Sequence, residues 1–275
     1  TLRADRLGCY GYERPTSPRL DALAETLDAV ADIGLVSVML ANNETGVLEP
    51  IAEAAEIAHA HDALIHCDGI QGAGKIAMDI NELGIDLLSL SAHKFGGPKG
   101  VGVLILRRGT DLAARIRGGG QEMGRRAGTE NVIGIAGMAA AARAAQRDLG
   151  EGVWSRVKTL RDRMEQAVEN AAPDLIFAGR GAARLPNTSC FAAAGWKGET
   201  QVMAMDLAGI AISAGSACSS GKVRPSRVLT AMGYESDVAQ SAIRVWLGVE
   251  TTEEQVMRFA DAWSSAYRKM RARAA

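Results

Sequence analysis

Ionisable side chains stand directly after two apolar runs of the sequence, at the points where buried strands would end. Asp68 follows the run ALIHC, and Lys94 follows DLLSLSAH. A lysine that is held on a rigid element and partly desolvated has a lowered pKa, which frees its lone pair for a Schiff base. A nearby carboxylate can hold a protonated pyridine nitrogen, so the two side chains together favour pyridoxal 5′-phosphate (PLP) as a cofactor. Ser91 and His93 add donors of the kind that bind a phosphate.

Cys218 differs from the other cysteines because it lies in a run of small residues, SAGSACSSG. A structural cysteine normally sits among bulky apolar side chains. A loop of small residues changes shape at low cost, so Cys218 is expected to be a reachable nucleophilic thiol. Lys222, Arg224 and Arg227 either favour its thiolate or form a solvated basic loop, and the residues leave both interpretations open. The remaining cysteines, which are expected to be inert, are Cys9, Cys67 and Cys190.

The elements that must position these side chains can be predicted from the apolar runs. Strands are expected at 34–40, 63–68, 86–93 and 100–107, with helices at 20–30 and 49–61. Continuous apolar strands of this kind are typical of a mostly parallel sheet that is buried on both faces, with ligands bound beyond the carboxyl ends of the strands. Asn42 and Asn43, Asp68, and His93 and Lys94 follow three successive strands. This convergence outweighs the alternative that Lys94 is an ordinary surface lysine.

The second half of the chain has a different character. A glycine-rich loop at 118–131 precedes an Ala-rich helix, and the pattern predicts a large domain at 1–149 and a smaller α/β domain at 150–275. The first twenty residues are rich in turn formers and predict a loop. In the smaller domain, helices are expected at 152–170, 198–208 and 252–272, and strands at 187–192, 209–215 and 241–248.

The bulk composition is that of a soluble globular protein. The chain has 275 residues, 47% of them hydrophobic, and a formal net charge of −1, which gives no support for a nucleic-acid or membrane-surface role. No apolar run reaches the roughly 18 residues that span a bilayer. The cysteines include no C-x-x-C pair, and the residues after Thr1 are polar, so no disulfide framework, zinc site or signal peptide is expected and a cytoplasmic location is favoured. His59 and His61 would point in different directions on a helix, so no metal site is expected.

Six blocks of the sequence occur in an order that resembles a known family. They are ANNETGVLEPI, HCDGIQGAGKIAMDINELGIDLLSLSAHKFGGPKGVG, GGGQEMGRRAGTEN, LPNTSC, SAGSACSSGKVRPSRVL and AIRVWLG. Together they resemble the NifS/IscS-like cysteine desulfurases of the class V aminotransferase family, over about residues 34–270. The resemblance implies the PLP-dependent transferase fold type I, with a mainly parallel large domain and a smaller C-terminal α/β domain. In that family a further segment with a phosphate-binding turn and a histidine precedes these blocks, so the large domain is expected to be N-terminally incomplete.

The resemblance also assigns roles to residues. The cofactor-binding residues that it implies are Asn43, Asp68, Gln71, Ser91, Ala92, His93, Lys94 and Thr129. Lys94 would carry the cofactor and move protons, Asp68 would hold the pyridine nitrogen, and Gln71 would bind the phenolic oxygen. Ser91, His93 and the Ala92 backbone would bind the phosphate, and Thr129 would complete the phosphate site of a neighbouring subunit, which implies a homodimer with shared active sites. Asn43 and Arg244 would bind the carboxylate of the substrate.

The activity that the resemblance implies is the removal of sulfur from L-cysteine. Cys218 would attack the substrate sulfur and become a persulfide, and alanine would be released. The sulfur would pass to an iron–sulfur scaffold or another acceptor protein, and Cys218 would serve as a transient iron–sulfur ligand with such a scaffold. A selenocysteine lyase, another class V PLP enzyme and an inactive, truncated sulfur-transfer scaffold remain as alternatives. Two residues depart from the family pattern: Gly69, where Ala is usual, and Trp246, which either narrows the pocket or packs inside the small domain.

Overall fold

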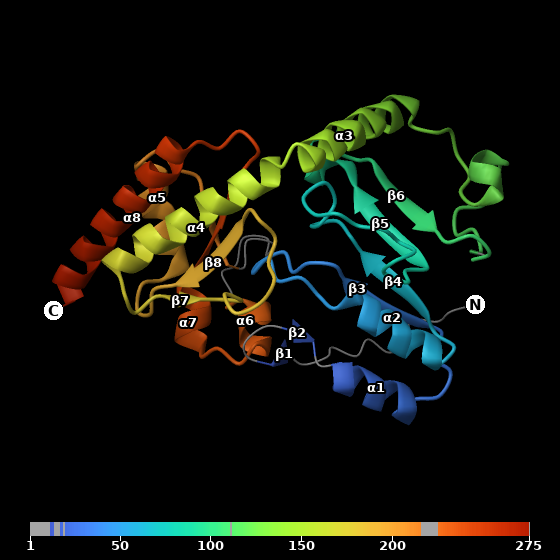
Figure 1. Ribbon diagram of the computed structural model, residues 1–275, viewed down its shortest axis with the longest axis horizontal. Helices are drawn as coiled ribbons and strands as arrows, with labels where there is room; N and C mark the ends of the chain where they lie inside the picture. The colour runs from blue at the N-terminus through green and yellow to red at the C-terminus, as the bar shows by residue number, and fades with distance from the viewer. Residues whose placement is uncertain (1–11, 14–16, 19, 111, 216–224, 275) are drawn as a thin grey trace. The chain divides into compact units, whose positions relative to one another are not determined.

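The structure, a computed structural model, describes residues 12–13, 17–18, 20–110, 112–215 and 225–274 (Figure 1). Cys9, Cys218, Lys222 and Arg224 lie outside these residues. The chain forms two compact units. Of the described residues, the first unit contains those within 20–40 and 49–151, and the second contains those within 12–18, 41–48 and 152–274. The domain boundary between residues 149 and 150 stays a prediction.

The first unit is built on a four-stranded sheet of order β3-β4-β5-β6. The strands β3 (Leu35–Met39), β4 (Leu64–Asp68) and β5 (Leu87–Ser91) are parallel, and β6 (Gly102–Leu106) pairs antiparallel with β5 at the edge. The register aligns Met39 with Asp68. The prediction of an α/β fold with a mainly parallel sheet is therefore confirmed.

Two helices cover one face of this sheet. Helix α2 (Ile51–Ala60) buries apolar side chains at a helical spacing of three and four, and α1 (Leu20–Ala29) packs beside it (Figure 1). Pro50 stands at the N-terminal cap of α2, where its lack of an N–H costs nothing. Val36 and Ile65 of the sheet join the core that these helices form.

The opposite face of the sheet carries a row of polar side chains. The ring of His66 forms hydrogen bonds with the hydroxyls of Ser37 and Ser89, each at 2.8 Å, across three strands. On the edge strands Leu35 and Leu104 are 38% and 42% exposed. The expectation of burial on both faces is therefore wrong for the described residues. The physical reason is that the polar residues within these mainly apolar strands, Ser37, His66 and Ser89, all lie on the face opposite the helices.

A long helix is the last element of the first unit in the sequence. Helix α3 (Val132–Gly150) begins at Asn131, whose side chain accepts a hydrogen bond from the Gly134 amide at 3.0 Å. The helix approaches the segment after β5 closely, because a Cβ on Gly134 would lie 2.3 Å from the side chain of Val101. Before α3 comes a short 3₁₀ segment, η2 (Gln121–Gly124).

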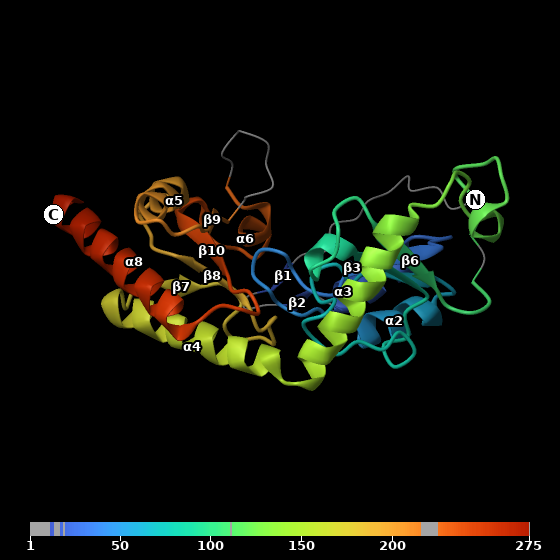
Figure 2. The same cartoon turned by 90° about the horizontal axis from the view of Figure 1, so that it is seen from above.

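The second unit is built on an antiparallel sheet of order β7-β8-β10-β9. Its strands are β7 (Ile176–Phe177), β8 (Thr188–Ala192), β9 (Ser213–Ala214) and β10 (Ala242–Trp246). The helices that pack on one face are α4 (Val153–Ala171), α5 (Gly198–Leu207) and α8 (Glu253–Ala274), and Figure 2 shows α4 and α8 side by side. Trp263 and Phe191 lie fully buried between them, with ring centroids 5.4 Å apart.

Several short elements were not predicted from the sequence. Helices α6 (Arg227–Ala231) and α7 (Ser236–Ser241) cover the other face of the second sheet, and β7 extends its edge. The strands β1 (Tyr12–Glu13) and β2 (Ser17–Pro18) pair antiparallel within a segment for which a loop was expected. Each of these elements has six residues or fewer, which is too short for a periodic pattern to stand out.

Candidate active site

Asp68 and Lys94 lie at the carboxyl ends of neighbouring parallel strands in the first unit. Asp68 is the last residue of β4, and its Oδ1 accepts a hydrogen bond from the Ile70 amide at 3.0 Å. Lys94 is the last residue of η1 (Ala92–Lys94), a single 3₁₀ turn that directly follows β5. Both side chains are half-buried. The edge of the sheet where the sequence predicts ligand binding thus carries a carboxylate and an amine.

Gln71 lies in the turn after β4, and its side chain has a buried oxygen, Oε1, without a hydrogen-bond partner among the described residues. An unsatisfied buried polar atom costs about 1–3 kcal/mol, so a site that keeps one normally pairs it with something else. A ligand group that donates a hydrogen bond, such as a phenolic O–H, would satisfy this acceptor, and the residues present therefore fit the cofactor that the sequence predicts.

The predicted phosphate-binding residues lie together on the segment that leaves β5. The Ser91 hydroxyl and His93 Nδ1 are 2.8 Å apart, and the His93 side chain is exposed. Ala92 between them is fully buried, and its amide donates to the Val101 carbonyl at 3.0 Å. The Ala92 amide is thus engaged within the fold, whereas the Ser91–His93 pair faces outward as a ready donor pair. Their phosphate role stays a prediction.

Thr129 lies apart from these residues along the chain, in the loop before α3. It is exposed, and the loop is braced by Arg126, whose Nη1 donates to the Gly128 carbonyl at 2.7 Å. Large apolar side chains near it in sequence are also exposed, Met123 to 86% and Ile133 to 89%. The role of Thr129 in a neighbouring subunit stays a prediction.

The second unit brings Asn43 and Arg244 together. Arg244 lies in β10 and is half-buried, and its Nη1 donates to the Asn43 carbonyl at 2.8 Å. Its guanidinium carbon lies 4.7 Å from the centre of the Trp246 ring. A guanidinium that is held in one plane by a carbonyl and an aromatic face is prepared to bind a carboxylate with its fork. Trp246 is 38% exposed, so it does not pack inside the core of its unit, which was one of the two interpretations of this residue.

Glu44 and Ser226 extend this group and were missed in the sequence. The Ser226 hydroxyl donates to Glu44 Oε2 and accepts from the Leu229 amide at 3.0 Å, which caps helix α6. Burial raises the pKa of Glu44, although the hydrogen bond from Ser226 and the charge of Arg244 oppose the rise. The sequence did offer a sign of Glu44, because it is the one charged residue in the stretch ANNETG, next to Asn43.

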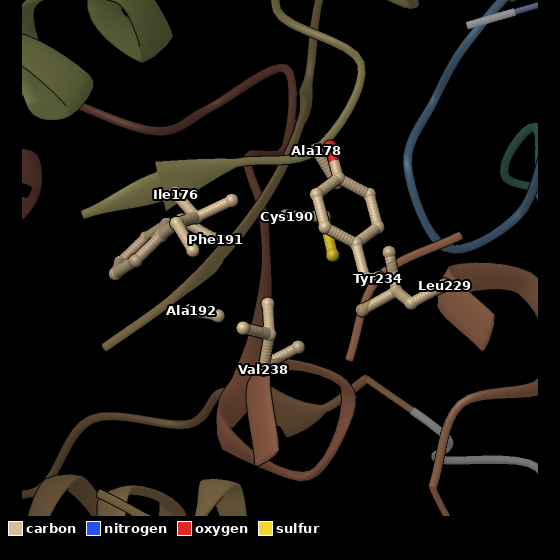
Figure 3. A pocket seen from close by; sticks show the side chains of 9 residues that line it. Ile176, Ala178, Cys190, Phe191, Ala192, Leu229, Tyr234 and Val238 are labelled. Carbon is tan, nitrogen blue, oxygen red and sulfur yellow. The ribbon is translucent and has the colours of Figure 1, made fainter. Parts of the chain in front are cut away.

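The described cysteines are not nucleophiles. Burial raises the pKa of both Cys67 and Cys190 to about 12. Figure 3 shows the Cys190 sulfur among carbon side chains in a pocket of the second unit, close to Tyr234 and Leu229. The pocket is lined by Ile176, Ala178, Cys190, Phe191, Ala192, Leu229, Tyr234, Val238 and Ala242. Its apolar lining offers nothing to stabilise a thiolate.

In the part of the chain that the structure describes, no three His, Cys, Asp or Glu side chains are grouped so that they could hold a metal ion. His59 and His61 instead have separate carboxylate partners, Asp86 at 2.8 Å and Asp28 at 2.9 Å. No helix among the same residues is long and apolar enough to cross a membrane.

Comparison with known proteins places these observations in a family. The sequence matches the family described as Aminotransferase class-V over residues 12–259. It is 48% identical over 224 residues to a cysteine desulfurase of Klebsiella pneumoniae, a match that covers 82% of this chain and 56% of that protein. It is 43% identical to the cysteine desulfurase IscS of Dictyoglomus turgidum, covering 87% of this chain and 61% of that protein.

Among solved structures, a NifS-like protein from Rickettsia africae is similar. The TM-score is 0.86 at 32% identity, and the match covers 94% of this chain and 69% of that chain. The chain therefore spans well under two thirds of the length of the two curated relatives that it matches, and about two thirds of the NifS-like chain.

Proposed function

The chain belongs to the class-V aminotransferase family, and from this premise we propose that it acts as a PLP-dependent cysteine desulfurase. The observation that carries the proposal is the edge of the first sheet, where Asp68 ends β4, Lys94 ends the 3₁₀ turn that follows β5, and the turn after β4 holds the Oε1 of Gln71, unpartnered among the described residues. Two relatives that are 48% and 43% identical to this chain over the aligned residues are named cysteine desulfurases. The substrate would be L-cysteine and the product L-alanine.

Residues of the first unit would hold the cofactor. Bound PLP supplies an electron sink that weakens the bonds to the α-carbon of an amino acid. The Asp68 carboxylate would hold the ring nitrogen protonated, and Gln71 would pair with the phenolic oxygen. The Lys94 amine would hold the aldehyde carbon and would move the α-proton of the substrate. Ser91 and His93 would bind the phosphate.

Residues of the second unit would bind the substrate and take its sulfur. Arg244 and Asn43 would bind the carboxylate of L-cysteine, which fixes the direction of its side chain. The Cys218 thiolate would attack the substrate sulfur, so that one S–S bond forms and the substrate C–S bond breaks. The proton count closes without an oxidant, because one thiol and L-cysteine give one persulfide and L-alanine. Cys218 is assigned from the sequence, since it lies outside the described residues.

The partners that we propose follow from the same premise. A second copy of the chain would bury the exposed apolar side chains near Thr129 and share its active sites, and an iron–sulfur scaffold or another sulfur acceptor would discharge Cys218. The predicted large domain, 1–149, would carry the cofactor. The predicted small domain, 150–275, would carry the sulfur-accepting cysteine. The free thiols of Cys67 and Cys190 suit a reducing compartment such as the cytoplasm.

Absorption spectroscopy with a matched lysine pair tests the cofactor site. The purified chain is mixed with PLP, dialysed, and compared with the variants Lys94→Ala and Lys99→Ala. The visible band of lysine-bound PLP is expected in the wild type and in Lys99→Ala, since Lys99 is exposed, and it should vanish in Lys94→Ala. A chain that stays colourless contradicts the proposal and favours an inactive sulfur-transfer scaffold.

Product analysis tests the reaction. With L-cysteine the wild type is expected to release alanine and, with a thiol reductant, sulfide. Cys218→Ser should keep the visible band and lose sulfide release by a factor of about 100 or more, since the nucleophile is gone. Unchanged sulfide release in this variant contradicts the persulfide role. Turnover of L-selenocysteine but not of L-cysteine would assign the chain to the selenocysteine lyase alternative.

A further inference from the structure

Lys75 is a buried lysine in the turn that follows β4, with 7% of its surface exposed. An ammonium group is seldom buried without partners, because its removal from water is costly. Its Nζ donates to the carbonyl oxygen of Gln71 at 2.7 Å and to that of Lys94 at 3.4 Å. One cation therefore joins the backbones of two residues that come from different strand ends and that the proposed function places on the same cofactor.

The turn is built so that it can approach η1 closely. Gly74 has a φ of +72°, and a Cβ there would lie 2.8 Å from Ala145 and 3.1 Å from the Cβ of Phe95, the residue after Lys94. A side chain at position 74 would therefore push the turn away from both α3 and η1. The glycine allows the approach, and the lysine that follows it makes the contact.

Lys75 binds the two carbonyl oxygens as a charged donor. Burial, and then the positive charge of Lys94, lower the pKa of Lys75 to about 8. The group still carries its proton at neutral pH, and a charged donor to a carbonyl is worth about twice a neutral one. A neutral donor or a water molecule could also bind these two carbonyls, without the cost of burying an ammonium group near Lys94.

We propose that Lys75 is a positioning residue that sets the spacing between the Gln71 side chain and the Lys94 amine. The phenolic oxygen and the aldehyde carbon of PLP, which these two groups would meet, are neighbours on one ring. If the distance between the Gln71 side chain and the Lys94 amine changed, the two groups could not both reach their atoms on the same ring. This inference rests on the proposed function. It adds Lys75, which would act on the cofactor site only through the backbones of Gln71 and Lys94.

The first test uses the cofactor-free chain and needs no activity. Deuterium uptake is followed at the amides of Phe95 and Gly97, which donate to the Ala92 carbonyl at 3.1 Å and 2.8 Å and so report on η1. Exchange there is expected to be about tenfold faster in Lys75→Met than in the wild type, because the hydrogen bond from Lys75 to the Lys94 carbonyl in η1 is lost. Lys75→Arg keeps charge and donors and is expected to stay within about threefold of the wild type.

Two controls separate local loosening from unfolding. Lys99→Met removes an exposed lysine of the same unit and is expected to leave these amides unchanged. Amides of β3 are expected to exchange at the wild-type rate in all variants. If β3 loosens in Lys75→Met, Lys75→Gln takes its place, since it keeps a donor and a similar length and still lacks the charge.

The second test follows the cofactor itself. PLP is added to each variant, the complex is reduced with borohydride, and mass spectrometry measures the fraction of chains modified at Lys94. The fraction at limiting PLP is expected to fall about tenfold in Lys75→Met and to recover in Lys75→Arg. No modification of the wild type contradicts the proposed function. If Lys75→Met and Lys75→Gln are modified at Lys94 as fully as the wild type, and exchange at η1 is unchanged, the role of Lys75 is overturned while the proposed function stands. The same conclusion follows if Lys75→Arg loses as much modification as Lys75→Met.

Discussion

Glu49 is a carboxylic acid that the fold keeps from water on both of its oxygens. It is 6% exposed, and neither carboxylate oxygen has a hydrogen-bond partner among the described residues. Burial raises its pKa from 4.5 to about 8. Between pH 4.5 and 8 the unfolded chain therefore ionises this group while the folded chain holds its proton, so the free energy of unfolding falls as the pH rises through that range.

Glu49→Gln is expected to remove this dependence. The variant should gain stability over the wild type from pH 4.5 upward, with a difference of about 3 kcal/mol near neutrality. Urea unfolding at a series of pH values measures the difference. Glu53→Gln, on the exposed side of α2, serves as the control and should show no pH-dependent gain. A Glu49→Gln difference that is constant from pH 4.5 to 8 would contradict the burial argument.

At the scale of elements, Asp86 ties three parts of the first unit together. Its Oδ2 accepts from His59 of α2 at 2.8 Å and from the Ile65 amide of β4 at 2.9 Å, and its Oδ1 accepts from Arg107 beyond β6 at 3.4 Å. Burial opposes ionisation of this carboxyl, but these hydrogen bonds and charges outweigh it and lower the pKa of Asp86. The side chain thus holds a helix and two strands in register at one buried point.

Asp86→Asn is expected to lower the free energy of unfolding by about 1–3 kcal/mol at pH 7. Since the folded pKa lies below 3.8, the stabilisation is present above that pH and is lost as the pH falls through the folded value. Thermal unfolding at pH 7 and at pH 3 measures both parts, and the gap between variant and wild type should shrink in acid. Asp206→Asn, an exposed carboxylate, is the control, and an equal gap at both pH values contradicts the prediction.

The elements also show where sequence reasoning succeeds and where it stops. Parallel strands and their polar ends were predictable because Asp68 and Lys94 follow their apolar runs directly, so local sequence carries the information. The contacts of Lys75 depend on which carbonyls lie within 3.5 Å once the turn and η1 are folded, and no local pattern encodes that. Gly69 is similar: a Cβ there would lie 2.7 Å from the Cδ1 of Leu88 on the next strand, a contact that the local sequence does not encode.

At the scale of the whole molecule, the exposed apolar side chains at the start of α3 predict self-association. Val132, Ile133 and Ile135 are 68%, 89% and 46% exposed, which is unusual for a surface that stays in water. Sedimentation of the wild type is expected to show a dimer, and Ile133→Glu should weaken its association by about tenfold or more. Leu207→Glu changes a side chain that is 90% exposed in the second unit and should leave the dimer intact. A wild type that is monomeric at all concentrations contradicts the prediction.

The second unit is not contiguous in sequence, and this has a consequence for any attempt to cut or recombine the chain. The segment Ala41–Leu48 belongs to it, and Leu185 donates to the Gly46 carbonyl at 2.7 Å while Leu48 donates to the Ala183 carbonyl at 2.9 Å. A fragment that starts at residue 152 would leave these groups, and the Arg244 bond to Asn43, without partners. A chimaera with a relative must therefore exchange 41–48 and the strands β1 and β2 together with the C-terminal part, since the second unit is assembled from three separate stretches of the chain.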